Sequence, residues 1–487
     1  MRQCTTAPDG SLLSSAGGPL ADAVLVGGAV RDLLLARPLA DLDWLVADPR
    51  RCAEALSRAL DGSVVALDPA RGHWRVVADG RCWDLIAPDP GDDRNGLHDP
   101  SERRPRLHEP GAGPGPSPLV EGVLERDLRR RDLTINALAA LPDGRVVDPT
   151  GGLRDLRDRI VRLSAPEVLA ADPLRAWRAV RFAAQLGFRL DEESAAWIAE
   201  LAPTLGLGGQ PLPAAERLQA ELSACLMSPV AGRAMAALDE LGLLAPVLPE
   251  LTAGRGMSQG PLHHLDVLQH QLEALQRLVD AFPAAEPALR WATLLHDVGK
   301  PLTLLHDEGD RPRFHGHDVV GAEVAARALR RLRLPSATVA HVAALIRAHM
   351  RPLPRDERAA RRFVHRLRPL LPDLLRLMVA DREAARGPLA SEAGRQRYRL
   401  ALAEVIQRLE SEPSAPAPLL DGREVMRLLQ LAPGPAVGEA LRAVDEARAV
   451  GEVTDLAEAE AYLRHMAALR GWPVGEGRGH DRDAGGA

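Results

Sequence analysis

The first hydrophobic pattern along the chain predicts a strand, a helix and a second strand in close succession. Val24–Val26 is an apolar triplet typical of a short buried strand. Ala29–Arg37 has a helix-forming composition, and Pro38 ends the helix. Asp41–Val46, with the sequence DLDWLV, begins a second strand.

The polar residues of this unit suit a phosphate and a divalent metal. Gly27 and Gly28 make a tight turn before the helix, where a phosphate can approach the backbone N–H groups. Arg31 adds a fixed positive charge beside the turn. Asp41 and Asp43 should project from one face, because side chains alternate along a strand. Such a carboxylate pair favours a metal that bridges nucleotide phosphates, although an ordinary glycine turn with solvent-facing acids is the alternative.

Further strands are expected before residue 150 and mostly helices after it. Arg75–Ala78 and Arg81–Ile86 flank Asp79-Gly80, a strong hairpin signal. Asp84 on the second of these strands is either an exposed acid or a third carboxylate of the metal site.

Length, charge and cysteine content narrow the class of protein. A chain of 487 residues predicts two to four domains. The net charge of −6 does not indicate a generally basic nucleic-acid binder, so any RNA site must be a local basic patch. The 61 basic residues include a single lysine, Lys300, and the arginines are planar donors suited to phosphate. The cysteines lack zinc or redox spacing and no apolar run reaches the ~18 residues of a membrane span, which favours a cytoplasmic protein.

Two later segments concentrate arginine. Arg129–Arg131 precede Asp132 and a strand expected to begin near Thr134. Three more arginines recur at every third position of a predicted helix: Arg175, Arg178 and Arg181. They share one face of that helix, and their mutual repulsion makes sense if an anion or a base edge lies there.

The acidic residue that precedes this helix has two interpretations. Asp172 stands before Pro173, as an ordinary N-cap would, or it takes part in a binding site. Arg217 and Glu221 on a following helix are spaced by four and are expected to pair with each other on the surface.

Several motifs together resemble the bacterial class of the tRNA nucleotidyltransferase and poly(A) polymerase family. GGAVRD at residues 27–32 followed by DLDW at residues 41–44 resembles the first motif. RRDLTINALA at residues 130–139 matches the second almost letter for letter. The resemblance implies a small mixed-sheet nucleotidyltransferase head followed by a mostly α-helical neck, an α+β fold overall.

The resemblance also implies roles for the head residues. Asp41 and Asp43 would be catalytic and hold Mg²⁺. The nucleotide-binding residues would be Gly27, Gly28, Arg31, Arg131, Asp132, Asp172, Arg175, Arg178 and Arg181. Within this set, Asp172 and Arg175 would bond to the base edge of the incoming nucleotide, select C or A and reject G and U. The family usually has Glu before this Asp, whereas this chain has Ala171, so we expect base selection to be altered or supported by another residue.

A second cluster resembles the HD-type metal-dependent phosphohydrolase domain. Nine of the fifteen histidines fall between residues 263 and 349, and LLHDVGKP contains the doublet His296-Asp297. Imidazole and carboxylate groups on packed helices suit a divalent metal that activates water. The resemblance implies His270, His296, Asp297 and Asp381 as metal ligands, with His315, His317 and His349 as pocket candidates.

These patterns predict five segments and one main function. The segments are a disordered tail (1–20), the head (21–160, with a flexible loop at 88–118), a helical neck (161–250), an HD domain (251–385) and a helical tail (386–487). The function implied is template-independent addition of C and/or A nucleotides (CCA addition) to the 3′ end of tRNA from CTP and ATP with Mg²⁺. A-adding, CC-adding or poly(A) activity, and an HD phosphohydrolase acting on RNA ends or nucleotides, are the alternatives.

Overall fold

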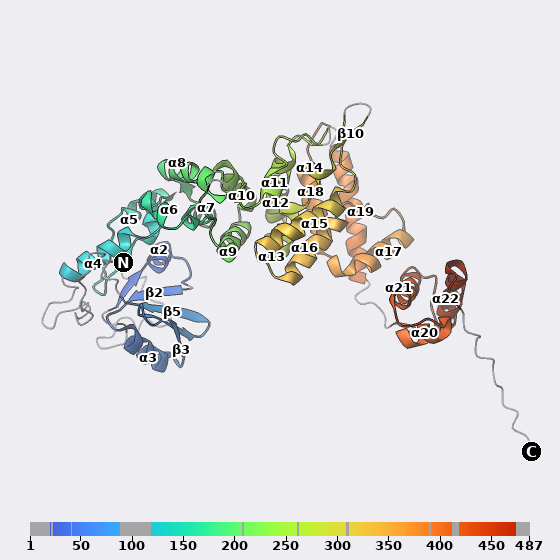
Figure 1. The fold of residues 1–487 in the computed structure, drawn as a ribbon, viewed down its shortest axis with the longest axis horizontal. Coiled ribbons are helices and arrows are strands. Elements are labelled where there is room, and N and C mark those ends of the chain that lie inside the picture. Colours follow the sequence, from blue (N-terminus) through green and yellow to red (C-terminus); the bar gives the residue numbers. More distant parts are fainter. Residues whose placement is uncertain are drawn as a thin grey trace, which may run out of the picture. The chain divides into compact units, whose positions relative to one another are not determined.

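The computed structural model describes residues 20, 23–39, 41–87, 118–206, 209–260, 263–307, 311–388, 391–411 and 418–473. The expected N-terminal tail, the loop at 88–118 and the last residues of the chain lie, almost entirely, outside this range. The chain divides into two compact units, Met1–Thr252 with Arg331–Arg333, and Ala253–Arg330 with Leu334–Ala487 (Figure 1).

The first unit contains a seven-stranded mixed sheet in the order β3-β4-β5-β2-β1-β6-β7. Neighbouring strands are antiparallel except β2 and β5, which are parallel. The strands are β1 (Val24–Val26), β2 (Asp41–Leu45), β3 (Ser63–Asp68), β4 (His73–Ala78), β5 (Arg81–Ile86), β6 (Ala139–Ala140) and β7 (Val146–Val147). The predicted hairpin at Asp79-Gly80 joins β4 and β5, with both residues at positive φ.

Two helices pack against this sheet. Val24, Val26 and Leu45 form a core with Leu124 and Leu128 of α4 (Pro118–Arg129). Helix α3 (Pro49–Leu60) packs against β4 and β5. The sheet thereby fixes β2, whose buried Leu42 and Trp44 alternate with Asp41 and Asp43.

The strand expected near Thr134 is instead a 3₁₀ turn, Thr134–Asn136, and the strand β6 begins only at Ala139. Thr134 donates its hydroxyl to Asp155 at 2.6 Å. A Cβ on Gly152 would lie 2.1 Å from the Thr134 carbonyl oxygen, so the helix that begins at Gly152 packs directly on this turn. This tertiary contact overrides the strand-like local sequence.

Helices dominate the rest of the first unit. They are α2 (Gly28–Leu34), α5 (Gly152–Asp158), α6 (Glu167–Ala171), α7 (Leu174–Leu186), α8 (Glu192–Leu201), α9 (Ala215–Leu226), α10 (Ala231–Glu240) and α11 (Pro249–Thr252). The only strands described after β7 in this unit are β8 (Ile160–Val161) and β9 (Arg189–Leu190). Helix α7 buries Trp177 completely and packs against α9 and α10.

The second unit is helical. Its larger part comprises α12 (Val267–Ala281), α13 (Pro287–Leu295), α14 (Lys300–Thr303), α15 (His317–Arg331), α16 (Ser336–Ala348), α17 (Glu357–Leu367), α18 (Asp373–Ala384) and α19 (Glu392–Ser411), with a short hairpin of β10 (Leu305–His306) and β11 (Pro312–Arg313). Helix α12 packs against α13 and α18, and α13 packs against α16. These contacts bring the ends of several helices together around the histidine cluster.

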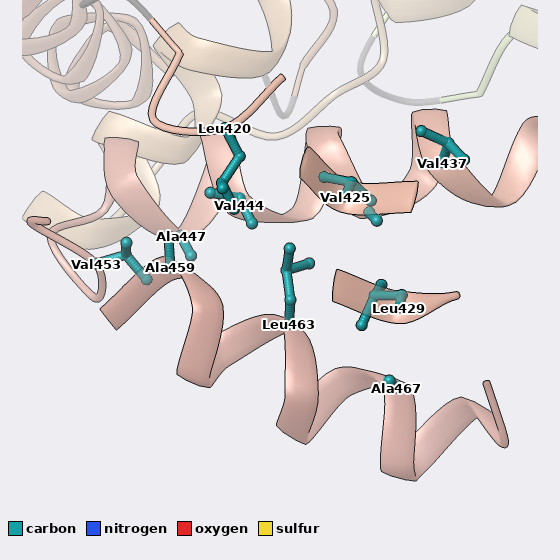
Figure 2. Close-up of a cluster of buried hydrophobic side chains, with 11 residues drawn as sticks. Leu420, Val425, Leu429, Val437, Val444, Ala447, Val453, Ala459, Leu463 and Ala467 are labelled. Carbon is teal, nitrogen blue, oxygen red and sulfur yellow. The ribbon is translucent and has the colours of Figure 1, made fainter. Parts of the chain in front are cut away.

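The last three helices share a core of their own. They are α20 (Gly422–Leu429), α21 (Pro435–Ala449) and α22 (Leu456–Arg470). Figure 2 shows Leu463 of α22 in the space beside Val425 and Leu429 of α20, and all three side chains are fully buried. Asp421 and Glu424 form a capping box that fixes the start of α20. The predicted α+β architecture, a mixed-sheet head followed by helices, is confirmed.

Candidate functional site

A glycine corner between β1 and α2 marks the first site. Gly27 has φ +76°, a conformation that L side chains rarely adopt. A Cβ here would lie 2.6 Å from Nη1 of Arg131 and 3.6 Å from Oδ2 of Asp43. The absence of a side chain therefore lets an arginine and a carboxylate meet at the corner.

The carboxylates of β2 crowd one another beside this corner. Asp43 is paired in register with Asp84 of the parallel strand β5. Burial raises the pKa of Asp43, Arg131 opposes the shift, and the negative charges of Asp84 and Asp41 add to it. A divalent cation would remove this repulsion, so Asp41 and Asp43 are chemically suited to hold one.

Asp84 is buried, so the expectation of an exposed strand acid is wrong. Its two oxygens accept from Nε and Nη2 of Arg75 at 2.6 and 2.7 Å, and His73 lies 3.6 Å away. This fork-to-fork contact fixes the third carboxylate next to Asp43 and neutralises it.

A cavity of about 410 Å³ opens beside the corner and the carboxylates. All of the predicted head residues line it except Gly27 and Arg181. The lining comprises Gly28, Ala29, Arg31, Asp32, Asp41, Asp43, Arg131, Asp132, Asn136, Asp172, Arg175, Arg178 and Phe182. The structure thus brings residues more than 130 positions apart in the chain to one hollow.

Acidic and aromatic neighbours hold the arginines of this cavity. Arg31 bonds to Asp32 and Asn136, and Arg131 bonds to Asp127. Arg178 forms an ion pair with Asp132 at 2.9 Å.

The ring of Phe182 lies 4.8 Å from the guanidinium carbon of Arg31 and 4.0 Å from that of Arg181. Several fixed cations beside acids suit a polyanion bound with a metal. Sequence reasoning missed Phe182, Asn136 and Asp127, because their contacts depend on the tertiary fold.

The pairing expected between Arg217 and Glu221 is wrong, because each reaches across to the region of α7. Nη2 of Arg217 lies 2.6 Å from Oδ2 of Asp172, and Glu221 accepts from Nε of Arg181. Asp172 also accepts from the backbone N–H of Leu174 at 3.2 Å, but the N-cap position of α7 is Pro173, so Asp172 is not the ordinary N-cap that was the alternative interpretation. The spacing of Arg217 and Glu221 shows from sequence that both lie on one face of a helix, but it does not predict which charged residues they contact.

The second unit gathers six of the predicted HD residues. They form two groups whose ligand atoms lie within 4.8 Å of one another: His270, His296 and Asp381, and Asp297, His317 and His349. Oδ2 of Asp297 lies 3.2 Å from Nε2 of His296, whereas its Oδ1 lies 3.3 Å from Nε2 of His317. Asp297 therefore lies between the two groups, with one oxygen toward each. His315 is exposed and belongs to neither.

The orientation of three histidines fits metal ligation. Nδ1 of His296, His317 and His349 bonds to a backbone carbonyl three residues earlier, at 2.8, 2.7 and 2.6 Å. Their Nε2 atoms are buried and face the carboxylate of Asp297 at 3.2 to 3.9 Å, and among the described residues they form no hydrogen bond of good geometry. An imidazole that donates Nδ1–H to a carbonyl presents Nε2 as an acceptor, the arrangement usual for metal-bound histidine.

Buried charges compensate one another at this cluster. Burial lowers the pKa of His296, but Asp297 and Asp381 outweigh it and raise the pKa to about 10. The pKa values of Asp297 and Asp381 lie well below the usual range, because neighbouring cations outweigh their burial. Lys300, the chain's only lysine, donates to Oδ2 of Asp297 and to Gln259 Oε1, both at 2.6 Å. A divalent cation would replace the imidazolium proton at the centre of this network.

Models of known protein families match three successive segments of the chain. The Poly A polymerase head domain matches residues 23–162, the probable RNA- and SrmB-binding site of polymerase A matches residues 187–254, and the HD domain matches residues 267–386. In the described part of the chain, no helix is long and apolar enough to cross a membrane.

Relatives of known activity cover nearly the whole chain. The A-adding tRNA nucleotidyltransferase of Deinococcus radiodurans is 49% identical over 91% of this chain and 95% of its own. The CC-adding tRNA nucleotidyltransferase of Thermus thermophilus is 42% identical over 91% and 93%. The CCA-adding enzyme of Bacillus stearothermophilus, solved with CTP, has the same fold, with a TM-score of 0.62 at 24% identity over 97% and 99% of the two chains. This chain therefore belongs to the tRNA nucleotidyltransferase family of enzymes, with a poly(A) polymerase head and an HD domain.

Proposed function

We propose that this protein adds A to the 3′ end of tRNA that already ends in CC. The observation that carries nucleotide addition is the single cavity that joins Asp41 and Asp43 to the arginines and to Asp172. The preference for A rests on the greater identity to the A-adding relative, 49% against 42% for the CC-adding one at equal coverage. Addition of CC, of all three nucleotides, or of a poly(A) tail uses the same head and is the alternative outcome. A tRNA substrate implies action in the cytoplasm.

The head residues support this chemistry through charge and position. Asp41 and Asp43 would hold Mg²⁺, which when bound neutralises charge on the α-phosphate and orients the RNA 3′ hydroxyl. Arg31 and Arg131 lie at the glycine corner, where they would bind the triphosphate and the departing pyrophosphate. Both arginines are already oriented by acidic or amide partners, so little reorganisation would accompany nucleotide binding.

Asp172 and Arg175 are suited to reading the base. Both line the same cavity as the carboxylates. An ionised carboxylate only accepts hydrogen bonds, so Asp172 would favour the amino group of adenine or cytosine and repel the carbonyl of guanine or uracil. Arg175 would supply donors to the neighbouring ring acceptor.

The test is addition of single nucleotides to tRNA transcripts that end before CCA, after C or after CC. With Mg²⁺ and ATP, we expect one A on the transcript ending in CC, and no extension by CTP of the other two. Extension of the shortest transcript by CTP would assign CC or CCA addition instead. Failure to extend any transcript would refute nucleotidyl transfer.

A second activity is favoured by the histidine cluster. We propose that the HD site holds two divalent metals, one on His270, His296 and Asp381 and one on His317 and His349, with Asp297 between them. The buried Nε2 atoms of His296, His317 and His349, which all face the carboxylate of Asp297, support this. Metals there would supply a hydroxide at neutral pH, which suits phosphoester hydrolysis.

Metal content tests the HD site without reference to activity. Protein stripped with a chelator and reloaded with Mn²⁺ or Ni²⁺ should retain two ions per chain after desalting, measured by mass spectrometry of the metal. The variant His317→Ala should retain about one ion per chain. The control variant His465→Ala, which changes an exposed histidine of α22, should retain two ions. One ion or none in the wild type would contradict a two-metal site.

A further inference from the structure

Helix α9 packs along the helix that carries the base-reading residues. Asp172 precedes α7, and Arg181 lies on it. The apolar side of α7, which includes Trp177 and Val180, is buried. Arg217 and Glu221 lie one turn apart on α9 and face these two residues. These two charged side chains of α9 thereby each meet an opposite charge that belongs to the predicted nucleotide site.

Arg217 holds both oxygens of Asp172. Its Nη2 lies 2.6 Å from Oδ2 and its Nη1 lies 3.4 Å from Oδ1, while Leu174 N–H donates to Oδ1. Burial opposes ionisation, but these bonds outweigh it and lower the pKa of Asp172. A carboxylate has about four lone-pair directions, so the held group can still accept from a base.

Glu221 holds the other end of the same face. It accepts from Nε of Arg181, and both side chains are largely buried, with 12% and 15% exposed. Gln185 accepts from Nη1 of Arg181 at 2.9 Å, and the guanidinium lies over the ring of Phe182. These contacts fix the orientation of the Arg181 guanidinium, which packs on Phe182, a residue that lines the cavity.

Residue 171 contributes no charge to this arrangement. Ala171 ends α6, and the nearby Arg175 bonds to the carbonyl of Val168 at 3.3 Å. A carboxylate at position 171 would be a natural local partner for an arginine one turn later. In this chain the orienting charge for the base-reading pair comes instead from α9, about 45 residues away in sequence.

We propose that Arg217 is a positioning residue for nucleotide selection, holding the Asp172 carboxylate where it accepts from the amino group of the incoming base. The proposal rests on the proposed nucleotidyl transfer and assigns its selectivity to a residue outside the cavity lining. Without Arg217 the Asp172 carboxylate could rotate away from the carbonyl of guanine. The repulsion that disfavours binding of GTP would then decrease, and the preference for ATP over GTP would fall. Glu221 plays a lesser part, because it acts on Asp172 only through the packing of α7.

The experiment compares incorporation of AMP and GMP into tRNA ending in CC by wild type and Arg217→Ala under single-turnover conditions. We expect kcat/KM for ATP to fall by about 10- to 100-fold, chiefly through KM, and the ATP-to-GTP preference to fall by about tenfold. Arg217→Lys keeps a charge but loses the two-pronged contact, so its preference should lie between the two. Arg233→Ala, an exposed arginine on α10, is the matched control and should behave as wild type.

A purely structural role predicts a different result. The melting temperature of Arg217→Ala would then fall and the rates with ATP and GTP would decline in parallel, leaving the preference unchanged. That result, or an unchanged preference in a folded Arg217→Lys should the alanine variant not fold, overturns the proposal. Absence of any addition by the wild type would instead refute the proposed function, so the two failures are distinct.

Discussion

The two acidic sites of this protein differ in what surrounds the carboxylates. In the head, Asp41 and Asp43 stand at the edge of an open cavity among arginines. In the HD site, Asp297 is only 2% exposed and lies among histidines. Both sites gather carboxylates that could bind a divalent cation, but only in the head does mutual repulsion raise the pKa of one of them.

The difference indicates two ways of using a metal. Arginines keep their charge at every accessible pH, so the head is suited to a large anionic substrate that enters together with its metal. Buried neutral imidazoles bind transition metals tightly and exclude water, so the HD site is suited to resident ions. The two sites should therefore be separable by substitution.

The largest expected effect is at the head carboxylates. Asp43→Asn should reduce AMP incorporation about 1,000-fold or more, because an amide cannot replace the carboxylate that neutralises and orients the metal. Metal-dependent hydrolysis by the HD site should stay within about twofold of wild type. Incorporation above a tenth of the wild-type rate would show that Asp43 does not hold the catalytic metal.

The reciprocal substitution tests the HD site. His296→Ala should reduce hydrolysis of a simple phosphodiester by about 100-fold or more, since it removes a proposed metal ligand and its contact with Asp297. AMP incorporation should be unchanged, as it should be in the surface control His465→Ala. Hydrolysis that persists in His296→Ala would assign it to a different site or to a contaminant.

A moderate effect is expected in the pH dependence of the metal-free second unit. The pKa values of His263 and His349 are lowered to about 4, chiefly by burial, so unfolding takes up protons and stability falls as pH drops from about 6.5 toward 4. The pKa of His296 is raised to about 10, so its contribution is complete below about 6.5 and is lost as pH rises toward 10.

Calorimetry in the presence of a chelator should therefore show maximum stability of this unit near pH 6.5. Reloading with Ni²⁺ should flatten the profile above neutral pH, because the metal then replaces the proton that His296 would lose. A metal-free profile that rises steadily from pH 6.5 to 9 would contradict the assigned charge state of His296.

The smallest effect expected is on the stability of the head. Burial and neighbouring acids raise the pKa of Asp43, so its ionised form destabilises the fold at neutral pH. In the absence of metal, Asp43→Asn should raise the melting temperature by about 1–3 °C, as thermal unfolding would record. A lower melting temperature would mean that the Arg131 charge already compensates the acids.

The sequence predicted the parts of each site that obey local rules. Asp41 and Asp43 share a face because strands alternate, and the glycine corner follows from two adjacent glycines after an apolar triplet. The same rules failed where a distant contact decides the outcome. Thr134 looked like the start of a strand, but Gly152 and Asp155 hold it in a turn.

Long side chains were the least predictable part of the site. Arg217 and Glu221 have the spacing of a surface pair, yet each finds a partner 40 or more residues away. Asp84 was expected to be either an exposed acid or a third carboxylate of the metal site; it is buried, and Arg75 on the adjacent strand engages both of its oxygens. An arginine can reach several neighbours, and only the packing of helices and strands determines which acid is closest.

The single lysine gives the folded protein an unusual chemical handle. Lys300 is 7% exposed and its ammonium is bonded to Asp297 and Gln259. Amine-directed reagents should therefore leave this side chain unmodified in the folded chain, and would reach it only once the HD site opens. The rate of acylation at Lys300 would report the opening of that site without any engineered label.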